Sequence, residues 1–276
     1  MMKKCILGLV AGLTLGANIA MAAENIYPIS REMGSGTRGA FTEIFGIQKE
    51  LKGKKIDATT TKAEVTNSTG VMMTTVANSK NAIGYISLGS LNDTVKAISV
   101  EGVMPSVENI NNKSYKISRP FNVVIKKSNP LIEDFLAYSI NAKAIIEKSG
   151  YIATKTKKFV SKKPKGKLVI AGSSSITPLM EKLVESYKSV NPNVVIEIQQ
   201  SDSTTGINVV VEGIADIGMV SREVKEAELK KGISVRVLAI DGLAIIVNKA
   251  NPITNITKDS VYKIFTGEMT TWDQVK

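Results

Sequence analysis

The sequence predicts an α/β protein, because short apolar runs alternate with helix-spaced apolar patterns from Glu24 to the end of the chain. The clearest unit begins with Leu168–Ala171, an apolar run typical of a buried strand. Gly172 and three serines interrupt the run, and apolar residues then recur at helical spacing up to Tyr187. This unit is therefore a strand, a hydroxyl-rich turn and a helix.

The remaining elements follow the same two patterns. Strands are expected at Ile26–Ser30, Ile83–Ser87, Ile98–Val103, Phe121–Ile125, Val194–Gln200, Ala215–Val220, Val235–Ile240 and Leu243–Val247. Helices are expected at Gly39–Leu51, Val71–Asn78, Ile132–Lys148 and Lys258–Phe265. Pro105–Lys113 is expected to be a polar connection. Thr154–Lys167 contains seven lysines, and we expect it to be a solvated linker because like charges repel.

Two further helix starts share the composition of the first. Gly34–Thr37 precedes a helical pattern through Phe45, and Ser201–Gly206 precedes another through Ile214. The first amides of a helix lack intrahelical acceptors and carry partial positive charge, so such turns suit an anion. One turn alone would indicate only a serine-capped helix. Together, the three predict a site that surrounds a single oxyanion with amides and hydroxyls.

The N-terminal segment Met1–Ala22 has the features of a secretory signal peptide. Lys3 and Lys4 precede an apolar stretch that ends in a small-x-small sequence at Ala22. The apolar stretch is short for a membrane span. The single cysteine, Cys5, lies in this segment, so the mature chain is expected to contain no disulfide.

Composition narrows the possible functions. The sequence contains no histidine, which excludes histidine general bases, Ser–His–Asp triads and the usual zinc ligand sets. Its net charge of +11, or +9 without Lys3 and Lys4, favours anionic partners. Aromatic residues make up only 5% and are not interleaved with the basic residues, which disfavours nucleic acid. A small anion fits this composition better.

Two short motifs suggest other activities. Gly34–Gly39 matches G-x-G-x-x-G after a strand, with Asp57 about twenty residues further on, as in dinucleotide-binding folds. A single match in an exported chain is weak support. Ser260–Lys263 matches the S-x-x-K pair of some acyl transferases. It falls on an amphipathic helix, where an exposed serine and lysine are ordinary.

Arg31 lies directly before a hydroxyl-rich helix start. A guanidinium in this place can offer a bidentate fork to a tetrahedral oxyanion. It can equally form a surface salt bridge with Glu32, and the sequence does not separate the two. Ser221-Arg222, at the end of another expected strand, leaves the same two possibilities open.

Several segments resemble the phosphate-binding protein of the bacterial high-affinity phosphate ABC transporter, and together they cover nearly the whole mature chain. They are Ala171–Pro178, Gln200–Gly206, Ala215–Arg222, Ile264–Gly267 with Trp272, Ser30–Arg38 and Ala82–Ser87. The resemblance implies a two-lobed periplasmic binding protein fold of type II. In such a fold the anion lies dehydrated between the lobes, and a membrane permease recognises the closed, loaded form.

The resemblance also implies the ligand residues. They are Ser174, Ser175, Ser203, Ser221, Arg31, Ser35, Gly36 and Thr37. Two positions depart from the family pattern: Ser221 replaces a common aspartate that accepts a phosphate proton, and Met33 replaces an acidic partner of the arginine. Selectivity against fully ionised sulfate is therefore open, because a carboxylate repels such an anion whereas a serine hydroxyl donates or accepts.

The order of the segments differs from that of the family, in which the Gly172 loop comes near the mature N-terminus and the Arg31 loop mid-chain. Each segment occurs once, and the lysine run stands where the usual ends would be joined. We therefore expect a circular permutant, with a fragment of a tandem fusion as the alternative. Residues 24–114 and 240–276 would form one lobe and residues 115–239 the other. Arg31 would lie beside Ser174, and the end of the chain after Trp272 would lie beside Glu24.

The sequence thus predicts an extracytoplasmic solute-binding protein, periplasmic or extracellular, that captures inorganic phosphate and delivers it to an ABC permease. We expect a monomer without enzymatic activity, cofactor, metal or nucleic acid. Three alternatives remain: another tetrahedral oxyanion such as sulfate, an adhesion or signalling role without transport, and an exported serine–lysine hydrolase acting through Ser260.

Overall fold

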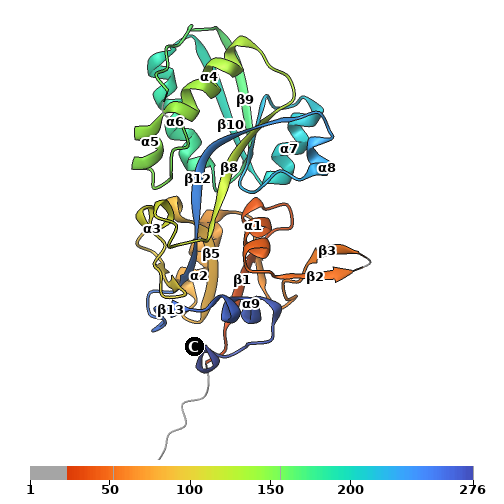
Figure 1. Ribbon diagram of the computed structural model, residues 1–276, viewed down its shortest axis with the longest axis vertical. Coiled ribbons are helices and arrows are strands. Elements are labelled where there is room, and N and C mark those ends of the chain that lie inside the picture. The colour runs from red at the N-terminus through yellow and green to blue at the C-terminus, as the bar shows by residue number, and fades with distance from the viewer. Residues whose placement is uncertain (1–23, 52, 156, 276) are drawn as a thin grey trace, which may run out of the picture.

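The computed structural model describes residues 24–275 except 52 and 156, and the predicted signal peptide and Cys5 lie outside this range. The described chain forms two α/β lobes joined by two long strands (Figure 1). The main sheet has the strand order β10-β9-β11-β8-β12-β5-β1-β4, with β6 paired to β12. The predicted α/β class is confirmed.

The arginine lobe is the lobe that carries Arg31. Its strands are β1 (Tyr27–Arg31), β4 (Glu64–Thr66), β5 (Ala82–Ser87), β6 (Lys96–Ala97) and the end of β12 (Ser234–Val247), with the small pairs β2 (Gln48–Leu51) and β3 (Lys54–Asp57), and β7 (Ser99–Val100) and β13 (Asn255–Ile256). Its helices are α1 (Gly36–Ile44), α2 (Thr69–Asn78), α3 (Val107–Asn111), α9 (Lys258–Thr266), η1 (Leu88–Ser90) and η2 (Trp272–Gln274). Phe41 of α1 stacks on Tyr85 at 3.8 Å and meets Phe265 edge-on at 4.6 Å, which fixes α1 and α9 against the sheet.

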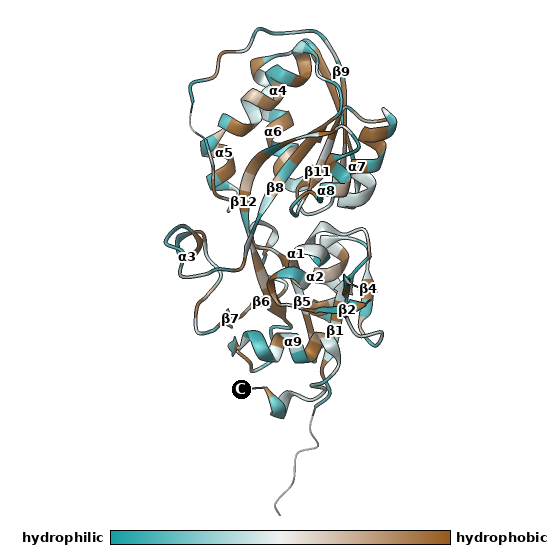
Figure 2. Cartoon of the chain, turned by 45° about the vertical axis from the view of Figure 1, so that its right-hand side comes forward, coloured by the Kyte–Doolittle hydropathy of each residue, from teal (hydrophilic) through white to brown (hydrophobic). Residues whose placement is uncertain are grey.

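The serine lobe is the lobe that carries Ser174. Its strands are β8 (Ser118–Ile125), β9 (Gly166–Ser173), β10 (Val194–Ser201), β11 (Ile217–Val220) and the start of β12, and its helices are α4 (Pro130–Asn141), α5 (Lys143–Lys148), α6 (Thr177–Val190), α7 (Ser203–Glu212) and α8 (Glu226–Leu229). Its core is separate from that of the arginine lobe. Figure 2 shows hydrophobic residues gathered on the strands of both lobes.

Strands β8 and β12 cross from one lobe to the other. β12 pairs with β8 up to Gly242, and from Leu243 onward it pairs with β5. The sequence predicted two separate strands here, Val235–Ile240 and Leu243–Val247, but they form one continuous strand. Gly242 marks close packing, because a Cβ there would lie 2.4 Å from Ile110 Cδ1. Asp241 is buried in an ion pair with Arg119.

Four other elements differ from the predictions. The strand expected at Ile98–Val103 is formed only by Ser99–Val100, because the chain turns at Glu101, where φ is +53°. The helix expected over Gly39–Leu51 ends at Ile44, because Gly46 takes φ +69° and the chain turns into the β2–β3 hairpin. The helix expected over Ile132–Lys148 breaks at Ala142, whose ψ of 54° is not helical. The connection Pro105–Lys113 contains a short helix, capped by the Ser106 side chain.

The lysine-rich segment is fixed to α4 and is not a free linker, which corrects the expectation. Asp134 of α4 accepts hydrogen bonds from Ser161 Oγ at 2.6 Å and from Lys162 N at 2.8 Å. Phe159 packs edge-on against Tyr138 of the same helix, with ring centroids 5.4 Å apart. The lysines themselves point to solvent. Within the described residues, no helix is both long and apolar enough to cross a membrane.

Candidate functional site

The site lies between the lobes, where the carboxyl ends of strands from both lobes face each other. β1 and β4 contribute from the arginine lobe, and β9, β10 and β11 contribute from the serine lobe. Each strand is followed by a polar loop that leads into a helix: α1, α2, α6, α7 and, after β11, α8. This is the place where open α/β sheets bind ligands.

Arg31, the last residue of β1, is only 2% exposed. Its Nη2 donates to Ser174 Oγ of the serine lobe at 3.1 Å. Its Nε and Nη2 also donate to the two carboxylate oxygens of Glu32, at 2.8 and 2.7 Å. The salt bridge with Glu32 is therefore present, although Arg31 is buried and not on the surface. The same guanidinium also contacts Ser174 of the other lobe, and its binding of an oxyanion stays a prediction.

Glu32 also corrects the interpretation of Met33. The sequence comparison placed Met33 where an acidic partner of the arginine was expected. Met33 is 75% exposed and points away, whereas the neighbouring Glu32 supplies the carboxylate. The supposed loss of the acidic partner was therefore wrong. The second departure stands, because Ser221 is a buried serine at the end of β11.

The predicted hydroxyl residues come together from both lobes. Thr37 Oγ1 and Ser175 Oγ are 2.7 Å apart across the cleft. Ser221 Oγ accepts from Ser173 Oγ at 2.8 Å, and Ser221 N donates to Ser203 Oγ at 3.0 Å. All of these side chains are buried. A cluster of hydroxyls with both donor and acceptor capacity thus lies beside one guanidinium.

Ser35 and Gly36 play other parts. Ser35 Oγ caps α1 by accepting from Arg38 N at 3.3 Å. Gly36 lies against the serine lobe, because a Cβ on it would be 2.2 Å from Ser203 Oγ and 2.7 Å from Ser221 Oγ. The predicted set therefore divides into hydroxyls in the cluster, a helix cap, and a glycine that permits close approach of the lobes.

All three glycines of the G-x-G-x-x-G motif lie where the serine lobe comes close to the arginine lobe. A Cβ on Gly34 would lie 2.3 Å from Asp202 Oδ1, and one on Gly39 would lie 3.1 Å from Arg222 Cδ. Asp57, the residue that would bind a ribose in the dinucleotide interpretation, instead accepts from Arg38 Nε at 2.6 Å. The motif and its acidic residue are thus both accounted for without a nucleotide.

Four arginine–carboxylate pairs surround the cluster: Arg31–Glu32, Arg38–Asp57, Arg119–Asp241 and Arg222–Glu228. Three of these arginines also hold site loops, since Arg38 donates to the Arg31 carbonyl, Arg119 to the Ser221 carbonyl and Arg222 to Thr204 Oγ1. Each positive charge has a partner, so the loops are fixed without a large excess of buried charge.

Burial raises the pKa values of the carboxyl groups in three of these pairs, whereas hydrogen bonds from their partners lower them. Burial alone would raise the pKa of Asp57, but hydrogen bonds from Arg38 and Thr59 lower it below 3.8. The pKa of Glu228 is likewise lowered, because Arg222 and Lys225 N outweigh its burial. Asp241 differs: burial raises its pKa to about 6 despite Arg119 and Ser87.

Sequence reasoning missed Thr69 and Ser173. Thr69 Oγ1 lies 3.0 Å from Ser175 Oγ, and Thr69 N donates to Ser174 Oγ at 3.3 Å. The signal was present in the sequence, because the hydroxyl-rich segment Thr66–Gly70 directly precedes the helix expected at Val71–Asn78. Ser173 was read as part of the first turn, without a role of its own.

The S-x-x-K motif shows no serine–lysine pair. Ser260 is 3% exposed, and its hydroxyl accepts from Thr257 Oγ1 at 2.9 Å. Lys263 Nζ lies 2.8 Å from Asp259 on the helix surface. The expectation that Ser260 would be exposed was wrong, and its burial leaves it poorly placed for nucleophilic attack.

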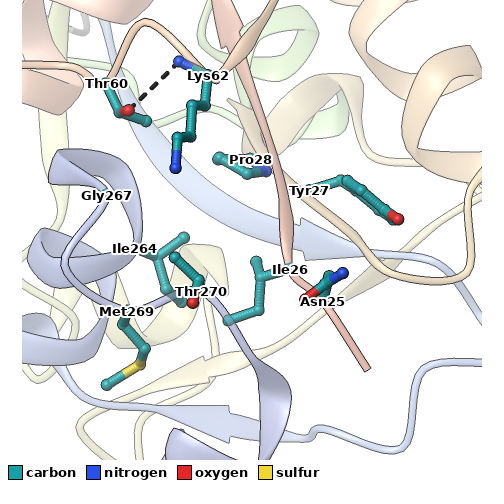
Figure 3. A pocket seen from close by; sticks show the side chains of 10 residues that line it. All are labelled: Asn25, Ile26, Tyr27, Pro28, Thr60, Lys62, Ile264, Gly267, Met269 and Thr270. Atoms are coloured by element: carbon teal, nitrogen blue, oxygen red, sulfur yellow. Dashed lines mark hydrogen bonds between the residues drawn. The ribbon is translucent and has the colours of Figure 1, made fainter. Parts of the chain in front are cut away.

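A separate cavity of 440 Å³ lies at the base of the arginine lobe, lined by residues that include Ile26, Pro28, Ile264 and Met269 (Figure 3). It shares no residue with the cluster between the lobes. Among the described residues, no group of three or more acidic, cysteine or histidine side chains could hold a metal ion.

Fold and site together define a two-lobed α/β protein in which hydroxyl-rich helix starts of both lobes meet beside the buried guanidinium of Arg31. A profile of the PBP superfamily domain matches residues 17–143 and 160–276. The chain is 48% identical over 275 residues to phosphate-binding protein PstS 2 of Streptococcus agalactiae, covering 98% of this chain and 94% of the relative. It is 42% identical to phosphate-binding protein PstS 2 of Streptococcus pneumoniae over the same shares of the two chains.

A solved structure from Streptococcus pneumoniae, described as a phosphate-binding protein of a phosphate ABC transporter, agrees with the fold. It is 42% identical, with a TM-score of 0.71 over 91% of this chain and all of that one. The chain therefore belongs to the PBP superfamily and, within it, to the family of the phosphate-binding proteins PstS.

Proposed function

We propose that this protein captures inorganic phosphate between its lobes and delivers it to an ABC permease. The observation that carries the proposal is the contact of Arg31 Nη2 with Ser174 Oγ at 3.1 Å, which joins a buried guanidinium of one lobe to a hydroxyl-rich helix start of the other. The names of the streptococcal relatives support phosphate as the anion.

The ligand groups of the proposal divide by chemistry. Arg31 supplies the charged donor, and the hydroxyls of Thr37, Ser174 and Ser175 lie within its reach. Ser203 and Ser221 close the other side, and the first amides of α1 supply neutral donors, whereas Thr204 N and Thr205 N of α7 already donate to Asp202. Ser35 and Gly36 act through the shape of the α1 start. Thr69 joins this set as a hydroxyl that lies between the lobes.

Ser221 shapes selectivity in this proposal. A hydroxyl can accept the proton of hydrogen phosphate, and it can also donate to fully ionised sulfate. Rejection of sulfate should therefore be weaker than at a site that presents a carboxylate, which repels a fully ionised anion. Sulfate is accordingly the competitor that any binding assay must include.

The proposal also says where and in what form the protein works. The protein would work outside the cytoplasmic membrane, after removal of the signal peptide expected before Glu24, and as a monomer. It would bind and release phosphate without a catalytic step. The partners already held by Ser260 and Lys263 support a role without serine–lysine hydrolysis.

We also propose that the chain order, which the streptococcal relatives share over nearly their whole length, is a circular permutation of the order in other members of the family. Trp272 N donates to the Glu24 carbonyl at 2.9 Å, so the end of the chain lies beside its first described residues, as predicted. Both sides of the site belong to one chain, which supports a permutant over a tandem fragment. The relative from Bacillus subtilis matches only 41% of this chain, as expected if one block aligns at a time.

Thermal unfolding tests the function. Phosphate at about one hundred times its dissociation constant should stabilise the fold by about 2.7 kcal/mol and raise the melting temperature by roughly 5–10 °C. Chloride at equal ionic strength should produce no such shift. Arg31→Ala should lose the shift with phosphate, because it removes the proposed charged donor. Arg236→Ala is its matched control and should keep the shift. It also breaks a bidentate arginine–carboxylate pair, but the partner is Glu133, away from the cluster. A shift with sulfate but none with phosphate would replace the proposed ligand.

A further inference from the structure

We propose that Arg119 is a positioning residue for the bound anion, fixing the loop of Ser221 and contributing positive charge that Asp241 controls. The inference rests on the proposed function, because it concerns how the same site holds phosphate.

The pair lies where the lobes are joined. Arg119 of β8 stands opposite Asp241 of β12, one position before β12 leaves β8 at Gly242 and continues along β5. Arg119 is 3% exposed and Asp241 is fully buried. Any relative movement of the lobes must therefore pass through the strands that carry this pair.

We call β8 and β12 the hinge strands, because they join the lobes. The Arg119 guanidinium donates hydrogen bonds both to Asp241 on a hinge strand and to the loop of Ser221. Nε and Nη2 both donate to Asp241 Oδ2 at 3.0 Å, while Nη1 donates to the Ser221 carbonyl at 3.0 Å. A buried ion pair is often no more stabilising than apolar side chains of the same volume. Stability alone therefore does not account for the third donor, which fixes the backbone of a proposed ligand loop.

The carboxylate reaches the arginine lobe. Asp241 Oδ1 accepts from Ser87 Oγ, at the end of β5, at 2.8 Å. The chain of contacts thus runs from Ser87 of one lobe, through the pair on the hinge strands, to Ser221 of the other. All of these contacts form together only when the two lobes keep this arrangement relative to the hinge strands.

The charge of the pair depends on Asp241. Four groups face this carboxyl: Arg119 on β8, the Ser87 hydroxyl on β5, the Gly89 amide on η1 and the Tyr151 hydroxyl in the loop after α5. Burial raises the pKa of Asp241 to about 6, so it gains a proton just below neutral pH. Protonation leaves Arg119 uncompensated, and the charges of Arg119 and Arg31 are close enough to affect each other. A bound anion should therefore favour the protonated form.

Calorimetric titration with phosphate at pH 5 to 8 tests the inference in the wild type and three variants. Arg119→Lys keeps a charge for Asp241 but loses the fork that also reaches Ser221, so binding should weaken about tenfold. Arg236→Lys, which lies on β12 as Asp241 does but is paired with Glu133, should bind as the wild type does. Asp241→Asn removes the titration, so the ratio of wild-type to variant affinity should rise about fivefold as the pH falls.

Taking this ratio cancels the ionisation of phosphate itself, which is the same for every variant. Ser87→Ala is the second probe if Arg119→Lys does not fold. Loss of the Ser87 hydrogen bond should raise the pH at which the ratio to Asp241→Asn changes. Wild-type affinity in a folded Arg119→Lys, or a flat ratio over the whole pH range, overturns the inference alone. A wild type that binds no phosphate overturns the proposed function together with it.

Discussion

Replacing Arg31 with alanine is the substitution with the largest expected effect on phosphate binding. The wild-type guanidinium is 2% exposed, and its Nη2 lies 3.1 Å from the proposed ligand residue Ser174. A hydrogen bond to a charged group is worth about 1.5–3 kcal/mol. Arg31 can offer the anion two of them, from Nη1 and, in place of Ser174, from Nη2, because Glu32 holds Nε and the other Nη2 proton. Loss of both hydrogen bonds amounts to about 3–6 kcal/mol, which corresponds to roughly a hundred- to ten-thousandfold weaker binding. Ser174→Ala removes one neutral partner and should cost about 1 kcal/mol.

Titration calorimetry of both variants measures these differences directly. Glu32 loses its partner in Arg31→Ala, but its side chain is 22% exposed and can be hydrated, so the variant should fold. Arg236→Ala, which breaks a similar fork with Glu133, should leave the dissociation constant unchanged. Equal losses for Arg31→Ala and Ser174→Ala, in folded proteins, would refute the assigned roles.

Three further predictions concern shape, pH and the lysine-rich segment. Gly36→Ala places a Cβ 2.2 Å from Ser203 Oγ, so small-angle scattering should show a more open protein that closes less with phosphate; full closure would contradict this role of the glycine. Folding raises the pKa of Asp241 from 3.8 to about 6, so the folded protein binds the proton more tightly than the unfolded chain does. The resulting contribution to the free energy of unfolding is fully present below pH 3.8 and is lost as the pH rises through 6. Denaturant unfolding should therefore show the wild type losing roughly 3 kcal/mol relative to Asp241→Asn between pH 4 and 7, and parallel curves would disprove it. Asp134→Ala frees the segment that it holds through Ser161, so trypsin should cut there faster than in a Glu133→Ala control; equal rates would count against the fixed segment.

Much of the fold could be predicted from periodicity alone. Long apolar patterns such as that of α6 gave the correct element type. Errors arose where tertiary contacts override local cues. The strands expected at Val235–Ile240 and Leu243–Val247 are one, because the ion pair of Asp241 with Arg119 and close packing at Gly242 keep β12 extended between them. The lysine run reads as solvated, and the buried contacts of its few other residues hold it to α4.

The site was partly predictable for a similar reason. Hydroxyl-rich helix starts are visible in a sequence, and those of Thr37 and Ser175 do meet across the cleft. The partners that fix the loops are not visible, because Arg119 lies on a strand without any local motif. Only the folded chain brings its Nη1 to the Ser221 carbonyl. A salt bridge of Arg31 with Glu32 was one of two possibilities that the sequence left open, whereas the family pattern placed the acidic partner at Met33.

The most direct test of the central claim is calorimetric titration of the wild-type protein with inorganic phosphate, followed by sulfate. We expect one phosphate per chain, bound in the cleft that Arg31 and Ser174 share, with sulfate binding more weakly. A titration that stays flat at millimolar phosphate would contradict the claim.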